Sequence, residues 1–285
     1  MRPPYALHRP DPVTTPVVVA SPHSGRHYPR AFLSAAMLDE RGIRSSEDAF
    51  VDRLVEGAPR LGAPLLAAEY PRAYLDLNRS PDELDPAVIA GVSRITQTAR
   101  ISSGLGVIPR VVANGRAIYR GKLSRAEAES RIAQVWQPYH ACLDGLLTEA
   151  HAMFGRAVLL DFHSMPHEAL DSIARPGHRR PDVVLGDRFG ASAHSDLMDG
   201  LEAAFFDEGL VVSRNAPFAG AFVTQHYGRP SQGRHAIQVE IDRGLYMDER
   251  RVEPSESFEA IQRVVQAVLG RFIANLPGAL PLAAE

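Results

Sequence analysis

An apolar run near the amino terminus ends directly in a histidine, and this feature most limits how the chain can fold. Residues 17–20 read Val-Val-Val-Ala and are followed by Ser-Pro-His-Ser-Gly, so His23 comes just after an apolar segment. β-Branched apolar runs that stop at a turn signal are typical of buried strands in parallel sheets. Gly25 allows a sharp backbone bend behind the histidine. We therefore expect a short buried strand that presents His23 at its carboxyl end.

The same arrangement recurs in the middle of the chain. Residues 157–160 read Ala-Val-Leu-Leu and are followed by Asp161, Phe162, His163 and Ser164. In open parallel sheets, binding sites lie outside the carboxyl ends of the strands. Two histidines presented in this way by distant segments predict one metal site. For either histidine alone, a hydrogen-bonded structural role is the alternative.

Strand and helix patterns alternate along the 285 residues. The predicted strands cover residues 17–20, 65–68, 73–77, 157–161, 182–185, 210–213 and 236–241. The predicted helices cover residues 29–40, a segment that opens at 45–48, a region that begins after Ser124, and 137–154, 193–207 and 255–275. Helices between apolar strands predict an α/β fold with a largely parallel or mixed sheet flanked by helices.

No linker long enough to separate domains is visible. We therefore expect one domain over residues 1–285, with residues 1–16 and 276–285 as terminal extensions. Residues 80–110 show little periodicity and contain several prolines and glycines. That length is unusual for a plain connection, which makes this segment a candidate binding loop.

Composition argues against several classes of protein. The chain is 45% hydrophobic and 23% charged with a net charge of −3, which is typical of a soluble enzyme with a sizeable core. The slightly acidic balance argues against nucleic acid or an anionic membrane surface as a partner. The single cysteine, Cys142, excludes an internal disulfide and a multi-cysteine zinc site. No apolar run approaches the ~18 residues of a membrane span and residues 1–16 lack a secretory pattern, so cytoplasm is the expected location.

Five short motifs, none of them specific alone, form an ordered set. They are Pro-His-Ser-Gly at 22–25, Asp-Leu-Asn-Arg at 76–79, Pro-Tyr-His at 138–140, Asp-Phe-His-Ser at 161–164 and Gln-Val-Glu-Ile-Asp-Arg-Gly-Leu-Tyr-Met at 238–247. Together they resemble the N-formylglutamate amidohydrolase family, in family order over most of the chain. That family is distantly similar to zinc carboxypeptidases and has a phosphorylase/hydrolase-like α/β fold. The resemblance implies a zinc amidohydrolase that cleaves N-formyl-L-glutamate to formate and glutamate in histidine degradation.

A catalytic zinc site usually has three protein ligands and keeps one position for water. His23 and His163 would supply nitrogen, and a carboxylate should supply the third ligand. The family pattern selects Asp48, with Glu47 as the fallback, although both acids could simply favour the positive end of a helix dipole. One Zn²⁺ per chain is expected, and the sequence does not exclude other divalent metals. Asp161 could orient its neighbouring histidine.

A second pair of histidines does not predict a metal site. His163 and His167 are four residues apart, but Pro166 opposes a helix that would hold both on one face. The segment also lacks the glutamate of a His-Glu-x-x-His zinc motif.

A zinc hydrolase also requires a base for its water. Glu240 is the predicted base, because a carboxylate inside the apolar strand 236–241 is costly to bury without a functional partner. Period-2 alternation places Gln238 on the same face of that strand. The resemblance independently places the general base here. An exposed face of an edge strand is the alternative interpretation, and Asp242 is the less favoured base.

The two carboxylates of the implied substrate require fixed guanidinium groups. Asn78 and Arg79 resemble the carboxylate-binding pair of zinc carboxypeptidases. Arg72 and Arg120 are secondary choices. Tyr246 either contacts substrate or packs in the core.

Other functions agree with the same residues. Among enzymes, the alternative is a carboxypeptidase-like peptidase or another small-acyl deacylase. A non-catalytic binding protein that keeps the fold and the metal is the alternative outside enzymes. Glu240 favours an enzyme, because a binding protein needs metal ligands but no base. The expected partner is a small acidic N-acyl amino acid, and the sequence does not determine the oligomeric state.

Overall fold

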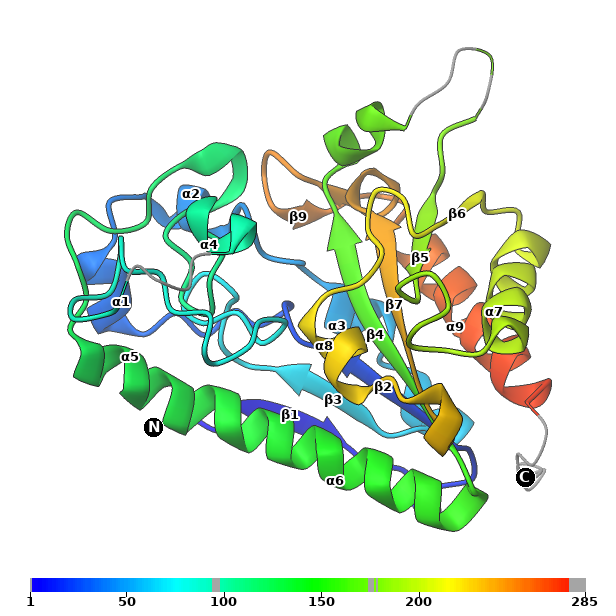
Figure 1. The fold of residues 1–285 in the computed structure, drawn as a ribbon. Coiled ribbons are helices and arrows are strands. Elements are labelled where there is room, and N and C mark those ends of the chain that lie inside the picture. Colours follow the sequence, from blue (N-terminus) through cyan, green and yellow to red (C-terminus); the bar gives the residue numbers. More distant parts are fainter. Residues whose placement is uncertain (1, 94–97, 174–176, 178, 277–285) are drawn as a thin grey trace. The chain divides into compact units, whose positions relative to one another are not determined.

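The computed structural model describes residues 2–93, 98–173, 177 and 179–276. Within these residues, seven strands form a mixed sheet in the order β1-β3-β2-β4-β7-β5-β6. The bounds are β1 Tyr5–His8, β2 Val17–Ser21, β3 Leu65–Ala68, β4 Ala157–Met165, β5 Val183–Gly186, β6 Val212–Arg214 and β7 Arg234–Asp242, with β8 Met247–Asp248 and β9 Glu253–Pro254 forming a separate pair. β2, β4 and β7 lie side by side and are parallel, whereas β5 is antiparallel to β7 and parallel to β6 (Figure 1). The predicted α/β class with a mixed sheet is confirmed.

Helices flank this sheet. Their bounds are α1 Arg30–Ala35, α2 Glu40–Arg44, α3 Val51–Leu54, α4 Ala99–Ser102, α5 Arg125–Arg131, α6 Gln137–Phe154, α7 Ser195–Asp207, α8 Phe222–Tyr227 and α9 Phe258–Ala274. α8 packs against β4 and β7, α3 packs against β4 and α9, and α9 also contacts α7 (Figure 1). Among the described residues, no helix is long and apolar enough to cross a bilayer.

Contacts within the chain divide it into two compact units. The first holds the loops that follow β2 and β3. The second holds β2, β4, β5 and β7, whose apolar side chains are buried, and β6, which is partly buried to exposed. The first unit comprises residues 1–6, 22–49 and 67–142, and the second comprises 7–21, 50–66 and 143–285.

Two elements predicted in the early part of the chain are wrong. The helix expected over residues 29–40 divides into α1 and α2, because Asp39 begins a new helix by accepting a hydrogen bond from the N–H of Gly42 at 2.6 Å. Residues 73–77 form turns rather than a strand. Three strands were not predicted: β1, which lies within residues 1–16, and the short pair β8 and β9. Of the predicted carboxyl-terminal extension, residues 277–285 lie outside the described part of the chain, as do 94–97 of the predicted binding loop.

The helix expected to open at residues 45–48 begins later. Phe50 has a φ of 66°, in the left-handed region, which interrupts a right-handed helix, so α3 begins at Val51. The preceding turn brings the backbone N–H of Asp48 within 3.0 Å of the carbonyl oxygen of His23.

The helical region after Ser124 agrees with its prediction. The hydroxyl of Ser124 accepts a hydrogen bond from the N–H of Glu127 at 3.1 Å, and α5 begins at Arg125. Residues 132–136 form a π-helical turn before α6 starts at Gln137. Pro138 lacks an N–H and would crowd the carbonyl of the preceding turn, so the π turn accommodates it without ending the helix.

The stability of the fold should depend on pH through His235, at the start of β7. This imidazole is 5% exposed, and its ring lies 4.9 Å from that of His194. Burial, and then the charge of His194, lowers the pKa of His235 to about 4. The unfolded chain binds this proton near pH ~6.5, so the contribution to stability is complete above that pH and is lost as the pH falls toward 4.

Thermal unfolding followed by circular dichroism should therefore show a midpoint that falls between pH 7 and pH 5. His235→Gln should flatten this slope, whereas the same change at the exposed His8 should not. Equal slopes in the wild type and His235→Gln would contradict the assignment.

Candidate active site

A close backbone approach holds His23 at the carboxyl end of β2. A Cβ on Gly25 would lie 2.2 Å from the carbonyl oxygen of Tyr70, so glycine is required at this turn. His23 Nδ1 lies 3.3 Å from Asp48 Oδ2. Both side chains are almost fully buried. The short loop after β2 therefore places an imidazole beside a carboxylate away from bulk water.

A second buried carboxylate contacts the other nitrogen of His23. Asp76 Oδ1 lies 2.7 Å from His23 Nε2 and also accepts the backbone N–H of Asn78 at 2.8 Å. Arg72 Nη2 donates to Asp76 Oδ2 at 2.9 Å. Burial alone would raise the pKa of Asp76, but the positive groups around it, His23 and Arg72 foremost, hold that pKa well below its usual range. Because an ionised Asp76 can only accept, the proton of His23 lies on Nε2, and Nδ1 carries the lone pair that can bind a metal.

His163 has the same kind of partner on β4. Asp161 Oδ2 lies 2.9 Å from His163 Nε2, and both side chains are buried. The two residues are two positions apart on one strand and therefore share a face. The predicted contact between Asp161 and His163 is confirmed. It again leaves Nδ1 as the nitrogen that could bind a metal.

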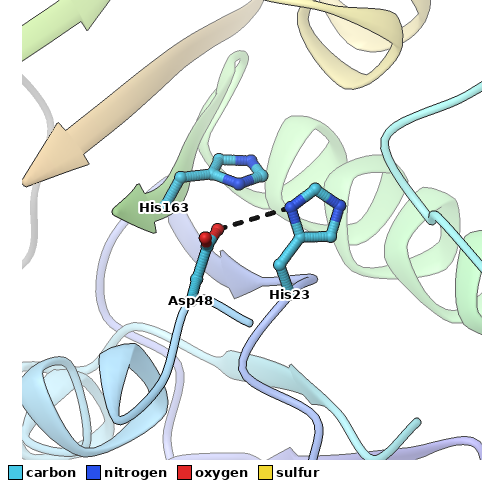
Figure 2. A group of neighbouring side chains, drawn as sticks. All are labelled: His23, Asp48 and His163. Carbon is cyan, nitrogen blue, oxygen red and sulfur yellow. Dashed lines mark ion pairs between the residues drawn. The ribbon is translucent and has the colours of Figure 1, made fainter. Parts of the chain in front are cut away.

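Three of the predicted ligands form one group. One ligand atom from each of His23, Asp48 and His163 lies within 4.8 Å of the others, and all three residues are buried. Figure 2 shows both imidazole rings close to the carboxylate. Two imidazole nitrogens and one carboxylate oxygen form a ligand set that suits zinc or a similar divalent ion.

Glu47 has a different environment. Its Oε2 accepts hydrogen bonds from Tyr28 at 2.9 Å and from Arg44 Nε at 3.0 Å, and its Oε1 accepts one from Arg44 Nη2 at 3.0 Å. Burial, and then the charge of Glu47, raises the pKa of Tyr28, which keeps this hydroxyl a donor. Both oxygens of Glu47 are therefore engaged in fixing the loop that carries Asp48.

Glu240 lies beside His163 in the parallel register of β7 and β4. Its carboxylate is largely buried, and Oε1 accepts a hydrogen bond from Gln238 Nε2 at 2.8 Å, which confirms that these side chains share a face. β7 lies between β4 and β5, so the alternative of an exposed edge strand is wrong. Asp242 is occupied elsewhere: Oδ2 lies 2.7 Å from His167 Nδ1, and Oδ1 accepts a backbone N–H.

The segment that carries Asn78 and Arg79 is held by the start of α6 and the residue before it. Trp136 Nε1 donates to the carbonyl oxygen of Arg79 at 2.9 Å, and His140 Nε2 lies 2.9 Å from the carbonyl oxygen of Leu77. The Pro-Tyr-His motif therefore fixes the Asp-Leu-Asn-Arg motif, a relation that the sequence did not reveal.

Arg79 is bound by neutral acceptors. Its Nε donates to the carbonyl oxygen of Leu105 at 2.9 Å, and Nη1 donates to that of Asn78 at 2.7 Å. Nη2 donates to no residue that the structure describes. The guanidinium is thus fixed in place while its positive charge is not paired by these contacts.

The other predicted substrate contacts have separate environments. Arg72 is bound to Asp76, so it supports the carboxylate behind His23. Arg120 is exposed. Tyr246 is fully buried with its ring packed edge-on against Phe258, which favours the packing role over a substrate contact.

The sequence analysis predicted no role for Asp76, although this residue contacts His23. It opens the Asp-Leu-Asn-Arg motif, which was the available signal, but the motif directed attention to Asn78 and Arg79. Its contact with His23 joins two loops distant in sequence, and no periodicity reveals such a pair.

The fold and the site define an α/β protein with a buried two-histidine, one-aspartate group beside a strand carboxylate. The family model of N-formylglutamate amidohydrolase matches residues 15–247. The chain belongs to this family.

Relatives are similar over nearly the whole chain. The chain is 34% identical over 268 residues to N-formylglutamate deformylase of Pseudomonas aeruginosa, covering 91% of this chain and 93% of the relative. It is 30% identical over 268 residues to N-formylglutamate deformylase of Pseudomonas putida, covering 92% of each. The crystal structure of N-formylglutamate amidohydrolase from Ralstonia eutropha JMP134 superposes with a TM-score of 0.89 at 36% identity, covering 96% of this chain and 98% of that one.

If Asp76 fixes the tautomer of His23, its removal should weaken metal binding without removing a ligand. Asp76→Asn presents an amide that can donate to Nε2 and so stabilises the wrong tautomer. We expect zinc affinity, measured by competition with a chromogenic chelator, to fall about 10–100-fold. Asp85→Asn is the matched control, because Asp85 is an equally buried acid paired with Arg110. An unchanged affinity in Asp76→Asn would show that Asp76 only supports the loop.

Proposed function

We propose that this protein is a zinc-dependent amidohydrolase that cleaves N-formyl-L-glutamate, or a closely related N-acyl acidic amino acid, to formate and the free amino acid. The observation that carries the proposal is the buried group of His23, Asp48 and His163 together with Glu240, the register neighbour of His163. The names of the similar proteins from Pseudomonas and Ralstonia support this substrate. From the resemblance we place the reaction in histidine degradation in the cytoplasm.

The metal ligands in this proposal are His23 Nδ1, His163 Nδ1 and a carboxylate oxygen of Asp48. One zinc ion held there would polarise the formyl carbonyl and acidify a water molecule. Asp76 and Asp161 keep the two imidazoles in the tautomer that binds a cation. Glu47 is assigned to the loop, because Arg44 and Tyr28 occupy its oxygens.

Glu240 is assigned as the general base. It accepts a proton from the attacking water and later passes it to the nitrogen of the departing amino acid. Gln238 donates to one oxygen of Glu240 and so fixes the direction of its carboxylate. Burial of the strand excludes bulk water and strengthens these interactions.

Arg79, with Asn78, is assigned to the carboxylate next to the scissile amide. A buried guanidinium held by two carbonyl oxygens keeps its charge for an anion, and its planar fork suits a carboxylate. Arg72 and Arg120 remain secondary choices, and Arg72 acts through Asp76 in the contacts described above.

The choice between Asp48 and Glu47 can be tested by metal content. Asp48→Asn should lower the zinc bound per chain strongly, because a three-ligand site loses one charged ligand. Glu47→Gln is the control of matched size change; it should destabilise the loop but leave zinc content near one per chain. Elemental analysis of both purified variants measures this directly. The reverse order would make Glu47 the ligand.

Glu240→Gln separates chemistry from binding. The amide keeps the shape and much of the hydrogen bonding while it removes the basicity, so folding and zinc content should survive. We expect kcat for formate release to fall about 10²–10⁴-fold with a much smaller change in KM. Loss of zinc together with activity would make Glu240 a ligand or a structural acid. Absence of formate release from every N-formyl amino acid by zinc-loaded wild type would refute the proposed function.

A further inference from the structure

Three strands of the sheet present one row of side chains on the face that carries Glu240. β7 pairs with β4 on one side, where Glu240 lies beside His163, and with β5 on the other side, where Glu240 lies beside Val184. Paired residues point to the same face of a sheet, and so do residues two positions apart on one strand. His163, Glu240 and Val184 therefore form one row, and Met165 follows His163 on the same face. All four residues belong to the second compact unit.

Apolar side chains gather on this face, beside Glu240. Met165, Leu170 and Val184 form one apolar cluster in which each residue is at most 1% exposed, and the partly buried Phe218 packs against it. We refer to these four residues as the apolar wall. None of the four side chains carries a charge or a hydrogen-bond donor. Glu240 thus has an imidazole on one side and an apolar surface on the other.

The loop over residues 216–221 lies directly on this face of the sheet. Gly186 pairs with Gln238, and a Cβ on Gly186 would lie only 2.7 Å from the carbonyl carbon of Ala219. Glycine is required where two backbones approach so closely. The carbonyl oxygen of Ala219 also accepts the N–H of Arg188 at 2.8 Å. The backbone that carries the outermost residue of the apolar wall is therefore fixed against the sheet.

The proposed reaction determines which part of the substrate suits this wall. Glu240 takes a proton from the water that attacks the acyl carbon, so that carbon must lie within reach of a single bridging water. Apart from its oxygen and the amide nitrogen, the acyl carbon carries one further substituent, which is hydrogen in a formyl group and methyl in an acetyl group. The amino acid on the nitrogen carries two carboxylates, and an apolar surface cannot replace the water around them. The remaining acyl substituent is the part that an apolar surface can accept.

We propose that the apolar wall selects the acyl group by size, and that Phe218 is the residue that sets the limit. The inference rests on the proposed function and adds the discrimination between formyl and larger acyl groups. Phe218 is assigned this role because it is the only member of the wall with surface left for a ligand. A hydrogen fits beside the fixed ring, whereas a methyl group must displace the ring or move the acyl carbon away from Glu240.

The experiment compares N-formylglutamate with N-acetylglutamate, which differ by one methyl group. Glutamate release by the zinc-loaded full-length protein gives kcat/KM for both compounds. Phe218→Ala should raise the value for N-acetylglutamate relative to that for N-formylglutamate about 10–100-fold, the range in which a pocket discriminates one methylene group. Phe218→Leu, which keeps an apolar side chain in the wall, should shift the ratio less and in the same direction. An unchanged ratio in both variants overturns the assignment of Phe218.

Phe154→Ala is the matched control. It removes the same ring from another partly buried position, at the end of α6 and before the amino end of β4, whereas His163 lies toward the carboxyl end of that strand. The ratio of the two kcat/KM values should stay at its wild-type value. A rise equal to that of Phe218→Ala would show a general loosening of the fold and would also overturn the assignment.

Calorimetry measures the same selection without turnover, as the ratio of the Kd values of the two compounds. The wild type should bind N-formylglutamate more tightly, and Phe218→Ala should remove most of that preference. If neither compound is hydrolysed but the Kd ratio responds in this way, the proposed reaction is refuted and the apolar wall is supported. If the wild type hydrolyses both compounds equally well, the wall is overturned and the amidohydrolase activity stands.

Discussion

The parallel pairing of β4 with β7 is the constraint on which this structure depends. Its register places His163 beside Glu240 and Met165 beside Asp242. The side chains of two paired residues point to the same face of the sheet. A slip of one residue would send Glu240 to the opposite face from His163. Both strands are buried over nearly their whole length, so these polar groups lie where charge interactions are strong. The same pairing that completes the core therefore determines which side chains can act together.

A buried carboxylate is costly without a partner, and the partners of two buried aspartates orient the histidines of the site. Asp76 contacts Nε2 of His23, and Asp161 contacts Nε2 of His163. The first pair joins two loops, whereas the second lies within one strand. A carboxylate acceptor at Nε2 leaves the lone pair of each imidazole on Nδ1, so the fold itself selects the nitrogen that could bind a cation. The charges of His23 and then Arg72 keep the pKa of Asp76 low, so Arg72 supports the contact of Asp76 with His23. The orientation of both imidazoles thus follows from hydrogen-bonded pairs that the chain forms by itself.

Sequence reasoning reached the elements whose signals are local. Apolar runs ending in polar residues gave β2, β4 and β7, and the motifs at their ends gave His23, His163 and Glu240. The failures involve contacts distant in sequence or backbone exceptions. No sequence pattern predicts that Phe50 adopts a positive φ, so that α3 begins later than expected. Nor does any pattern predict that Asp76, in a predicted strand, contacts a histidine on another loop. The choice of Asp48 over Glu47 came from the family pattern; the physical reason, the engagement of Glu47 by Arg44 and Tyr28, requires coordinates.

The buried and half-buried arginines near the site differ in whether their hydrogen-bond acceptors are charged or neutral. That difference indicates which of them orient a neighbouring group and which could bind an anion. Arg72 and Arg44 are bound to buried carboxylates, so each pair is close to neutral and contributes orientation to a neighbouring group. Arg79 is bound to the carbonyl oxygens of Leu105 and Asn78, so neutral acceptors fix it in place. A guanidinium fixed by neutral partners has already lost much of its side-chain entropy, which favours recognition of a carboxylate.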